Sequence, residues 1–241
     1  MKRLFWLIPG AFLALVVFLP LSWVAPLALP SALTQPETTY RGTLWRGNIT
    51  ALQDVDSVEY RLNPFRLLTG EPPVQATLTA AGLQAEGAVG QNGAKDLSFR
   101  INVANLPMPD PRLKGLAGQI NVQIDEIKWD KQGNCEVLKG SARTDVLTRN
   151  RAIFSWEGPG LAGPLSCDAS GNFVFNLVGK DDLQSITSQV SISASGQYNS
   201  DMKVLTRDSE AAQVLPLFGF EERGQTPQGA EFRLVEQGKW R

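Results

Sequence analysis

The chain has 241 residues, of which 43% are hydrophobic and 20% charged, and its formal net charge is −1. It contains no basic block and no stripe of lysine and arginine. We therefore expect no nucleic-acid partner, because such binding depends on neutralising phosphates. The chain also lacks histidine, which removes the commonest general base and every Ser-His-Asp or Cys-His arrangement.

The N-terminal region is dominated by an apolar run, Leu4–Leu29, which follows Lys2 and Arg3 and contains one polar side chain, Ser22. About 20 apolar residues at ~1.5 Å per residue cross a bilayer core of ~30 Å. We therefore predict a transmembrane helix over residues 4–24. Basic residues favour the cytoplasmic side, so residues 1–3 are expected there and the rest of the chain on the opposite face.

A cleaved signal peptide is the alternative, since it begins with a similar basic segment. Its apolar core is normally about 7–15 residues long and ends at a small-x-small site. The run in this chain is longer, and Pro26 and Pro30 lie where cleavage would occur. A permanent anchor is therefore favoured, with a linker over residues 25–39 and one domain over residues 40–241.

Alternation of apolar and polar residues dominates after Tyr40 and predicts strands with one buried and one exposed face. Turn signals rich in glycine and asparagine separate the strands and indicate antiparallel hairpins. The phase of the alternation slips at Asp125–Glu126, which predicts a β-bulge. The fold class expected is therefore mainly β, an antiparallel and twisted sheet with few short helices. The clearest alternating sets are Val74, Ala76, Leu78 and Ala80; Leu97, Phe99, Ile101 and Val103; Ile120, Val122 and Ile124; and Val190, Ile192 and Ala194.

Two segments are helix candidates. Asp208–Phe218 has one apolar face and a capping residue at its start, although Pro216 keeps it short. A second lies near Pro111–Leu116, after a proline-rich connector. Strand patterning restarts there, so we expect any internal boundary near residues 105–115. The length allows either one large β-domain or two small ones.

The two cysteines, Cys135 and Cys167, both follow the apolar run. In an oxidising compartment a disulfide between them is the default expectation, and two separate buried thiols are the alternative. A metal site would need more soft ligands than this chain offers.

The search for reactive groups identifies no assembled active site. Gly158–Gly163 matches G-x-G-x-x-G, but Pro164 and a strand-like segment follow it instead of a helix, so a structured turn is expected. The adjacent acids Asp181-Asp182 and Glu221-Glu222 diverge on a strand and are read as solvated charge. We therefore assign no catalytic, cofactor-binding or metal-binding residue, and no cofactor.

Several short motifs follow one another in a characteristic order. They are Gly42-Thr43-Leu44-Trp45-Arg46-Gly47, Tyr60-Arg61-Leu62-Asn63-Pro64, Leu67-Leu68-Thr69-Gly70, Cys135 with Gly140, Trp156-Glu157-Gly158-Pro159 leading through Leu161 and Gly163 to Cys167, Leu215 to Gly219, and Gly238-Lys239-Trp240. In this order the motifs resemble the type II secretion system protein N family. This chain has Tyr60 where the family usually has tryptophan, a departure that concerns packing.

The resemblance implies a Gram-negative inner-membrane protein with a periplasmic domain, working in the export of folded proteins. It implies a non-enzymatic accessory component whose partners are other secretion-system subunits, either the inner-membrane platform or the outer-membrane secretin. The alternative is an anchored lipid-handling protein with an apolar β-groove. Large inward-facing residues distinguish the two, because a closed core would bury them and a lipid groove would expose them. These residues are Phe99, Trp129, Phe173 and Phe175.

Overall fold

The computed structural model describes residues 19–23, 37–52, 55–106 and 115–239. Most of the segment predicted to span the membrane, residues 4–24, lies outside these ranges. Within the described part, no helix is both long enough and apolar enough to cross a bilayer. The backbone N–H of Leu44 donates to the carbonyl of Leu19 at 3.0 Å, and Pro20 forms a β-bridge with Thr43. The chain at residues 19 and 20 is thus bound to a sheet and is not helical.

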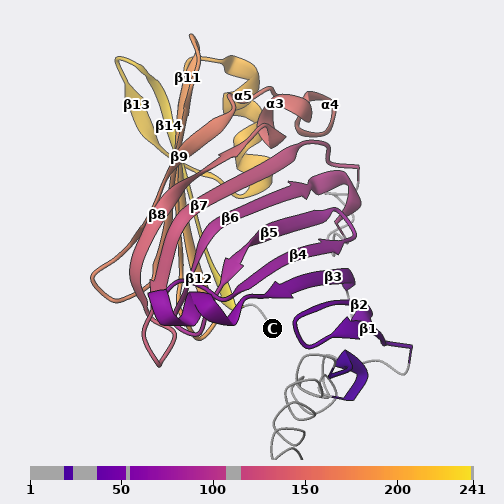
Figure 1. The fold of residues 1–241 in the computed structure, drawn as a ribbon. Coiled ribbons are helices and arrows are strands. Elements are labelled where there is room, and N and C mark those ends of the chain that lie inside the picture. The colour runs from indigo at the N-terminus through magenta and orange to yellow at the C-terminus, as the bar shows by residue number, and fades with distance from the viewer. Residues whose placement is uncertain (1–18, 24–36, 53–54, 107–114, 240–241) are drawn as a thin grey trace, which may run out of the picture. The chain divides into compact units, whose positions relative to one another are not determined.

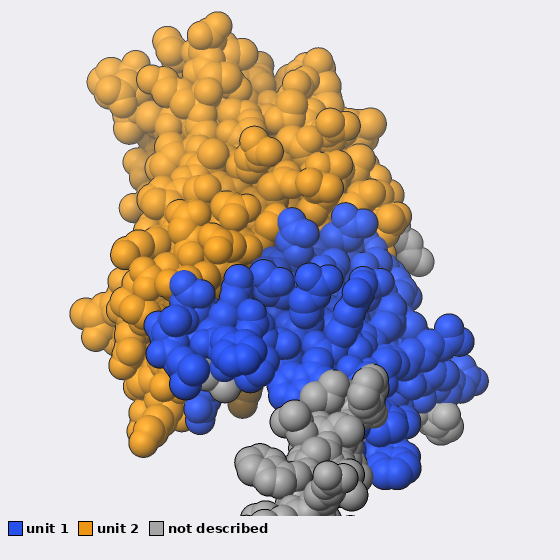
Figure 2. Space-filling model, in the orientation of Figure 1, with its two compact units in different colours: residues 1–91 blue, residues 92–241 orange. Residues whose placement is uncertain are grey.

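The chain divides into two compact units, residues 1–91 and residues 92–241 (Figure 2). The division falls between Gln91 and Asn92. The internal boundary expected near residues 105–115 stays a prediction, because residues 107–114 are not described.

The sheet of the first unit has the strand order β1-β2-β3-β4-β5, and each strand runs antiparallel to the next. The predicted alternation in β4 is present: its apolar residues share one face and are partly buried. A short 3-10 helix, η2, connects β3 to β4. The bounds are β1 Thr39–Thr43, β2 Arg46–Leu52, β3 Val55–Leu62, η2 Pro64–Thr69, β4 Val74–Ala80 and β5 Leu83–Val89.

The second unit is also an antiparallel sheet, with the order β6-β7-β8-β9-β10-β11-β12-β14-β13 (Figure 1). Within this unit the first and last strands of the order, β6 and β13, are not paired with each other, so the order does not close on itself. The predicted fold class, mainly β and antiparallel with few short helices, is confirmed. The strands are β6 Gly93–Asn102, β7 Gln119–Trp129, β8 Cys135–Thr144, β9 Leu161–Cys167, β10 Phe173–Lys180, β11 Gln184–Ile192, β12 Gln197–Thr206, β13 Glu221–Thr226 and β14 Gly229–Lys239.

Two local features determine how neighbouring strands of this sheet pair. The pairing of β7 with β8 shifts between Ile124 and Glu126, so the predicted bulge at Asp125 is confirmed. In β9, a Cβ on Gly163 would lie 1.8 Å from the carbonyl oxygen of Asn176 on β10. Only glycine allows this close backbone approach.

The remaining elements of the second unit are short helices. The predicted helix Asp208–Phe218 is present as α5, Ser209–Val214, continued by the 3-10 helix η5, Leu215–Phe218. The carboxylate of Asp208 caps α5 by accepting a hydrogen bond from the N–H of Glu210 at 2.9 Å. The other helices are η3 Val103–Asn105, α3 Val146–Arg149 and α4 Arg151–Phe154. Helices α3, α4 and α5 lie together at one end of the unit (Figure 1).

Candidate interaction surfaces

The disulfide joins the start of β8 to the end of β9. Cys135 and Cys167 are bonded, with their Cα atoms 5.6 Å apart, so the pairing predicted from the sequence is present. The N–H of Cys135 also donates to the carbonyl of Gly171 at 2.7 Å. The two strand ends are therefore held both covalently and by a backbone hydrogen bond.

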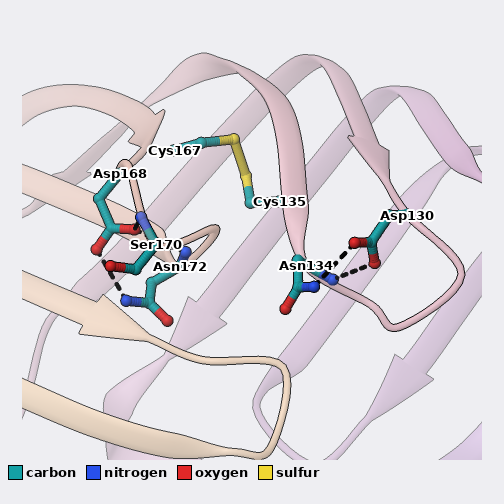
Figure 3. The surroundings of a disulfide bond; sticks show 7 residues. All are labelled: Asp130, Asn134, Cys135, Cys167, Asp168, Ser170 and Asn172. Carbon is teal, nitrogen blue, oxygen red and sulfur yellow. Dashed lines mark hydrogen bonds between the residues drawn. A yellow bond between two sulfur atoms is a disulfide. The ribbon is translucent and has the colours of Figure 1, made fainter.

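Each cysteine adjoins a turn of the same sequence, Asp-x-x-Gly-Asn, spanning Asp130–Asn134 and Asp168–Asn172 (Figure 3). In both turns the aspartate accepts hydrogen bonds from the backbone and side-chain nitrogens of the asparagine, at 2.8–2.9 Å. These bonds hold the pKa of both aspartates below the usual range. The sequence analysis predicted turns from the glycine and asparagine residues. It did not note that the pentapeptide occurs twice, although this repeat is visible in the sequence. The repeat thus places two turns with the same hydrogen bonds beside the disulfide.

Beside these turns, strands β6 to β10 carry an apolar face whose larger side chains are only partly buried. Five buried residues form its base: Ile124, Cys135, Leu138, Ala142 and Leu165. The larger side chains packed on them are partly exposed, and we call this set the aromatic face: Leu97, Phe99, Val122, Ile127, Phe173, Phe175 and Leu177. Because these residues are intermediate in exposure, part of this apolar face remains accessible to a binding partner.

The other end of the second unit is closed by its helices. A buried cluster there includes Trp156, Ile186, Val204, Ala211, Leu215 and Phe232, which come from β11, β12, β14 and the helical segments. The rings of Phe154 and Phe218 meet edge to face with centroids 5.3 Å apart. Here the apolar residues already have partners within the chain, so this end is a structural core.

A buried polar network fastens this core. The indole N–H of Trp156 donates to the side-chain oxygen of Gln184 at 2.7 Å. The amide nitrogen of Gln184 in turn donates to the carbonyl of Glu157 and to the carboxylate of Asp181, at 2.7 and 2.9 Å. Satisfying these polar atoms allows them to be buried without the usual penalty.

In the first unit, the motifs that carry the family resemblance meet at one end of the sheet. The phenol of Tyr60 donates to the carbonyl of Thr43 at 2.8 Å, and the N–H of Leu62 donates to the carbonyl of Trp45 at 2.7 Å. Leu21, from the N-terminal region, is buried in the same cluster. Sequence reasoning did not anticipate that these segments would be neighbours.

Charged groups lie on the polar surfaces and not in a reactive cluster. Lys128 and then Lys139 lower the pKa of Glu126 to about 2. Arg233 donates two hydrogen bonds to Asp201, at 2.8 and 2.9 Å, and holds its pKa below the usual range. Both arrangements link neighbouring strands of the second unit.

The glycine motif and the acidic pairs considered in the sequence analysis have structural roles or lie at the surface. Gly158 and Pro159 are buried in an irregular segment, and strand β9 begins at Leu161, where a phosphate-binding site would require a helix. The acidic pairs Asp181-Asp182 and Glu221-Glu222 are exposed. Among the described residues, no three cysteines or carboxylates gather as a metal site would require.

The described part of the second unit is thus an antiparallel sheet with a partly buried apolar face. The sequence matches the family described as Type II secretion system (T2SS), protein N, over residues 38–227. This is most of the chain, and the chain therefore belongs to that family and is a component of a type II secretion system. No curated protein and no solved structure matches it.

Proposed function

We propose that the chain is an accessory inner-membrane component that supports the export of folded proteins from the periplasm across the outer membrane. It acts through protein–protein contacts and catalyses no reaction. The observation that carries the proposal is the combination of family membership with the partly buried aromatic face of the second unit.

The aromatic face is a better docking surface than the open strand edge. Strand addition is a common docking mode, and β13 has one unpaired edge. Every residue of β13 is exposed, but it carries Glu221, Glu222 and Arg223, and its register breaks before Gly224. Charge and a bulge discourage edge pairing. We therefore place the contact with a secretion-system subunit on the aromatic face.

The proposal includes tethering. A single pass within residues 4–24 would keep the N-terminus in the cytoplasm and both β-units in the periplasm, within reach of the inner-membrane platform or the outer-membrane secretin. Tethering raises the effective concentration of a docking module, by 10²–10⁴-fold in linked systems. An untethered form should therefore dock poorly even when it folds.

The test compares the full chain with residues from Leu19 onward, which keep the contacts of Leu19, Pro20 and Leu21 with the first unit. The shorter form is expressed behind a cleavable signal in a strain that lacks the gene. Formation of the disulfide between Cys135 and Cys167 reports that the second unit folds, and amide protection in β2 and β3 reports that the first unit folds. We expect folded cargo enzyme to accumulate in the periplasm with the truncated form and to be exported with the full chain. Full rescue by the truncated form would contradict tethering.

Lipid handling is the second candidate, and the incomplete burial of Phe99, Trp129, Phe173 and Phe175 favours it. A groove for acyl chains would leave such rings partly exposed. Mass spectrometry of the detergent-purified protein distinguishes the two functions. Stoichiometric phospholipid on the purified protein, together with unchanged secretion in the deletion strain, would replace the first proposal by the second.

A further inference from the structure

One end of the first unit lies where the N-terminal apolar run meets the sheet. The β1–β2 turn is bound to this run through the hydrogen bond between Leu44 and Leu19 and the bridge between Thr43 and Pro20. The apolar run of the proposed anchor directly precedes these contacts in the sequence. An anchor there would place the β1–β2 turn beside the membrane surface.

The same end presents large apolar side chains to solvent. Strand β3 ends beside the β1–β2 turn, because Leu62 bonds to Trp45 there, and η2 follows directly. Within η2, Phe65 is 75% exposed and Leu68 is 85% exposed. Trp23, three residues after the bridged Pro20, is 68% exposed. Apolar and aromatic groups of this kind favour the interfacial layer of a bilayer.

The backbone of η2 is held by local hydrogen bonds that do not involve these apolar groups. The side-chain oxygen of Asn63 accepts from the N–H of Phe65 at 3.1 Å, and the hydroxyl of Thr69 donates to the carbonyl of Arg66 at 3.0 Å. The turn is thus formed independently of Phe65 and Leu68, which leaves their side chains available for an external contact.

Two arginines face each other close to this end. Arg46 and Arg61 are direct partners in the β2–β3 ladder, and their neighbours at the same level are Thr43 and Gln75. Both are exposed, and no carboxylate among the described residues forms an ion pair with either. Like charges placed opposite each other destabilise a sheet. A phosphate bound between the two guanidinium groups would relieve this repulsion.

We infer that this end of the first unit is a membrane-contact edge, which rests on the anchor in the proposed function. Phe65, Leu68 and Trp23 enter the interfacial layer of an anionic phospholipid bilayer, and Arg46 and Arg61 bind lipid phosphates. The edge fixes the strands of the first unit relative to the membrane. A bilayer is favoured over a protein partner because the edge adjoins the apolar run itself.

The test uses the full chain in vesicles of phosphatidylcholine and phosphatidylglycerol, with an environment-sensitive fluorophore on a single introduced cysteine. The native cysteines are disulfide-bonded and therefore do not react. Labelled Phe65→Cys and Leu68→Cys proteins are compared with Ala81→Cys, which is exposed at the opposite end of β4. Nitroxide-bearing lipids should quench the fluorophore at positions 65 and 68, and should leave the fluorophore at position 81 unquenched.

Flotation with the vesicles is measured first, so that the two proposals fail separately. Protein that does not float contradicts the anchor. Protein that floats but is quenched equally little at positions 65 and 81 overturns the membrane-contact edge alone. Protection of position 65 from an aqueous quencher without quenching by lipid would indicate a protein contact and would also overturn it.

The charge requirement has its own variant. Each basic residue near an anionic surface contributes attraction that corresponds to about fivefold in binding, so the double variant Arg46→Gln/Arg61→Gln should lower the ratio of docked to undocked edge by about 30-fold. Vesicles of phosphatidylcholine alone should have the same effect on the unsubstituted chain. Quenching at position 65 that is unchanged in both experiments would overturn the role of the arginines and the choice of an anionic bilayer.

Discussion

Removing the disulfide should weaken the second unit and leave the first unchanged. The double variant Cys135→Ala/Cys167→Ala removes a cross-link between two residues 32 positions apart in the sequence. In the chain-entropy relation, closing a loop of this length stabilises the folded state by about 3.7 kcal/mol. The hydrogen bond from Cys135 to Gly171 involves only backbone atoms, so the substitution does not remove it directly.

Amide hydrogen exchange measures this loss separately for each unit, because it reports local opening free energies along the chain. A loss of about 3.7 kcal/mol corresponds to a fall of about 500-fold in the protection of the slowest amides. We expect that fall in strands β8, β9 and β10, which adjoin the disulfide. Strands β3 and β4 of the first unit should keep their protection and serve as the internal control.

Two outcomes would refute this reasoning. A fall of less than tenfold in β8–β10 would mean that the two Asp-x-x-Gly-Asn turns hold the strand ends without the disulfide. An equal fall in β3 and β4 would mean that the two units unfold together.

Three further predictions concern the second unit. Gly163→Ala should lower the free energy of unfolding by about 1–3 kcal/mol in urea titrations, because the added methyl group meets a carbonyl of β10. The control Gly160→Ala should be near neutral, because the atom nearest to its methyl group, the carbonyl oxygen of Thr144, lies 3.5 Å away. Gln184→Leu leaves a buried indole N–H unpaired and should cost about 1–3 kcal/mol in the same assay; an unchanged midpoint would contradict it. Arg233 lowers the pKa of Asp201. The resulting stability is present above the ordinary carboxyl pKa and is lost as the pH falls through the lowered pKa. Asp201→Asn should therefore reduce the pH dependence of the unfolding midpoint in acid.

The local features of the sheet were predictable because they depend on neighbouring residues. The alternation of Val74 to Ala80 predicts one strand face, and the slip at Asp125 predicts a bulge, since a single extra residue reverses every later side chain. The helix after Asp208 was predictable from its cap and its apolar spacing for the same reason.

Features that depend on distant parts of the chain were not predictable in this way. Alternation does not show whether a sheet closes, so the partial exposure of Phe99 and Phe175 required the structure. The opposition of Arg46 and Arg61 follows from the register of two strands, which the spacing of the arginines alone does not reveal. The Asp-x-x-Gly-Asn repeat was visible in the sequence, but its meaning depends on the disulfide that places the two turns together.

The most direct test of the central claim is site-specific photo-crosslinking in cells from the aromatic face. A photoreactive residue at Phe175 is compared with one at Val178, which lies on the opposite face of the same strand and is exposed. We predict that position 175 crosslinks to a secretion-system subunit during export and that position 178 does not. Crosslinks from position 175 to phospholipid alone, or equal protein crosslinks from both positions, would contradict the proposed docking function of the aromatic face.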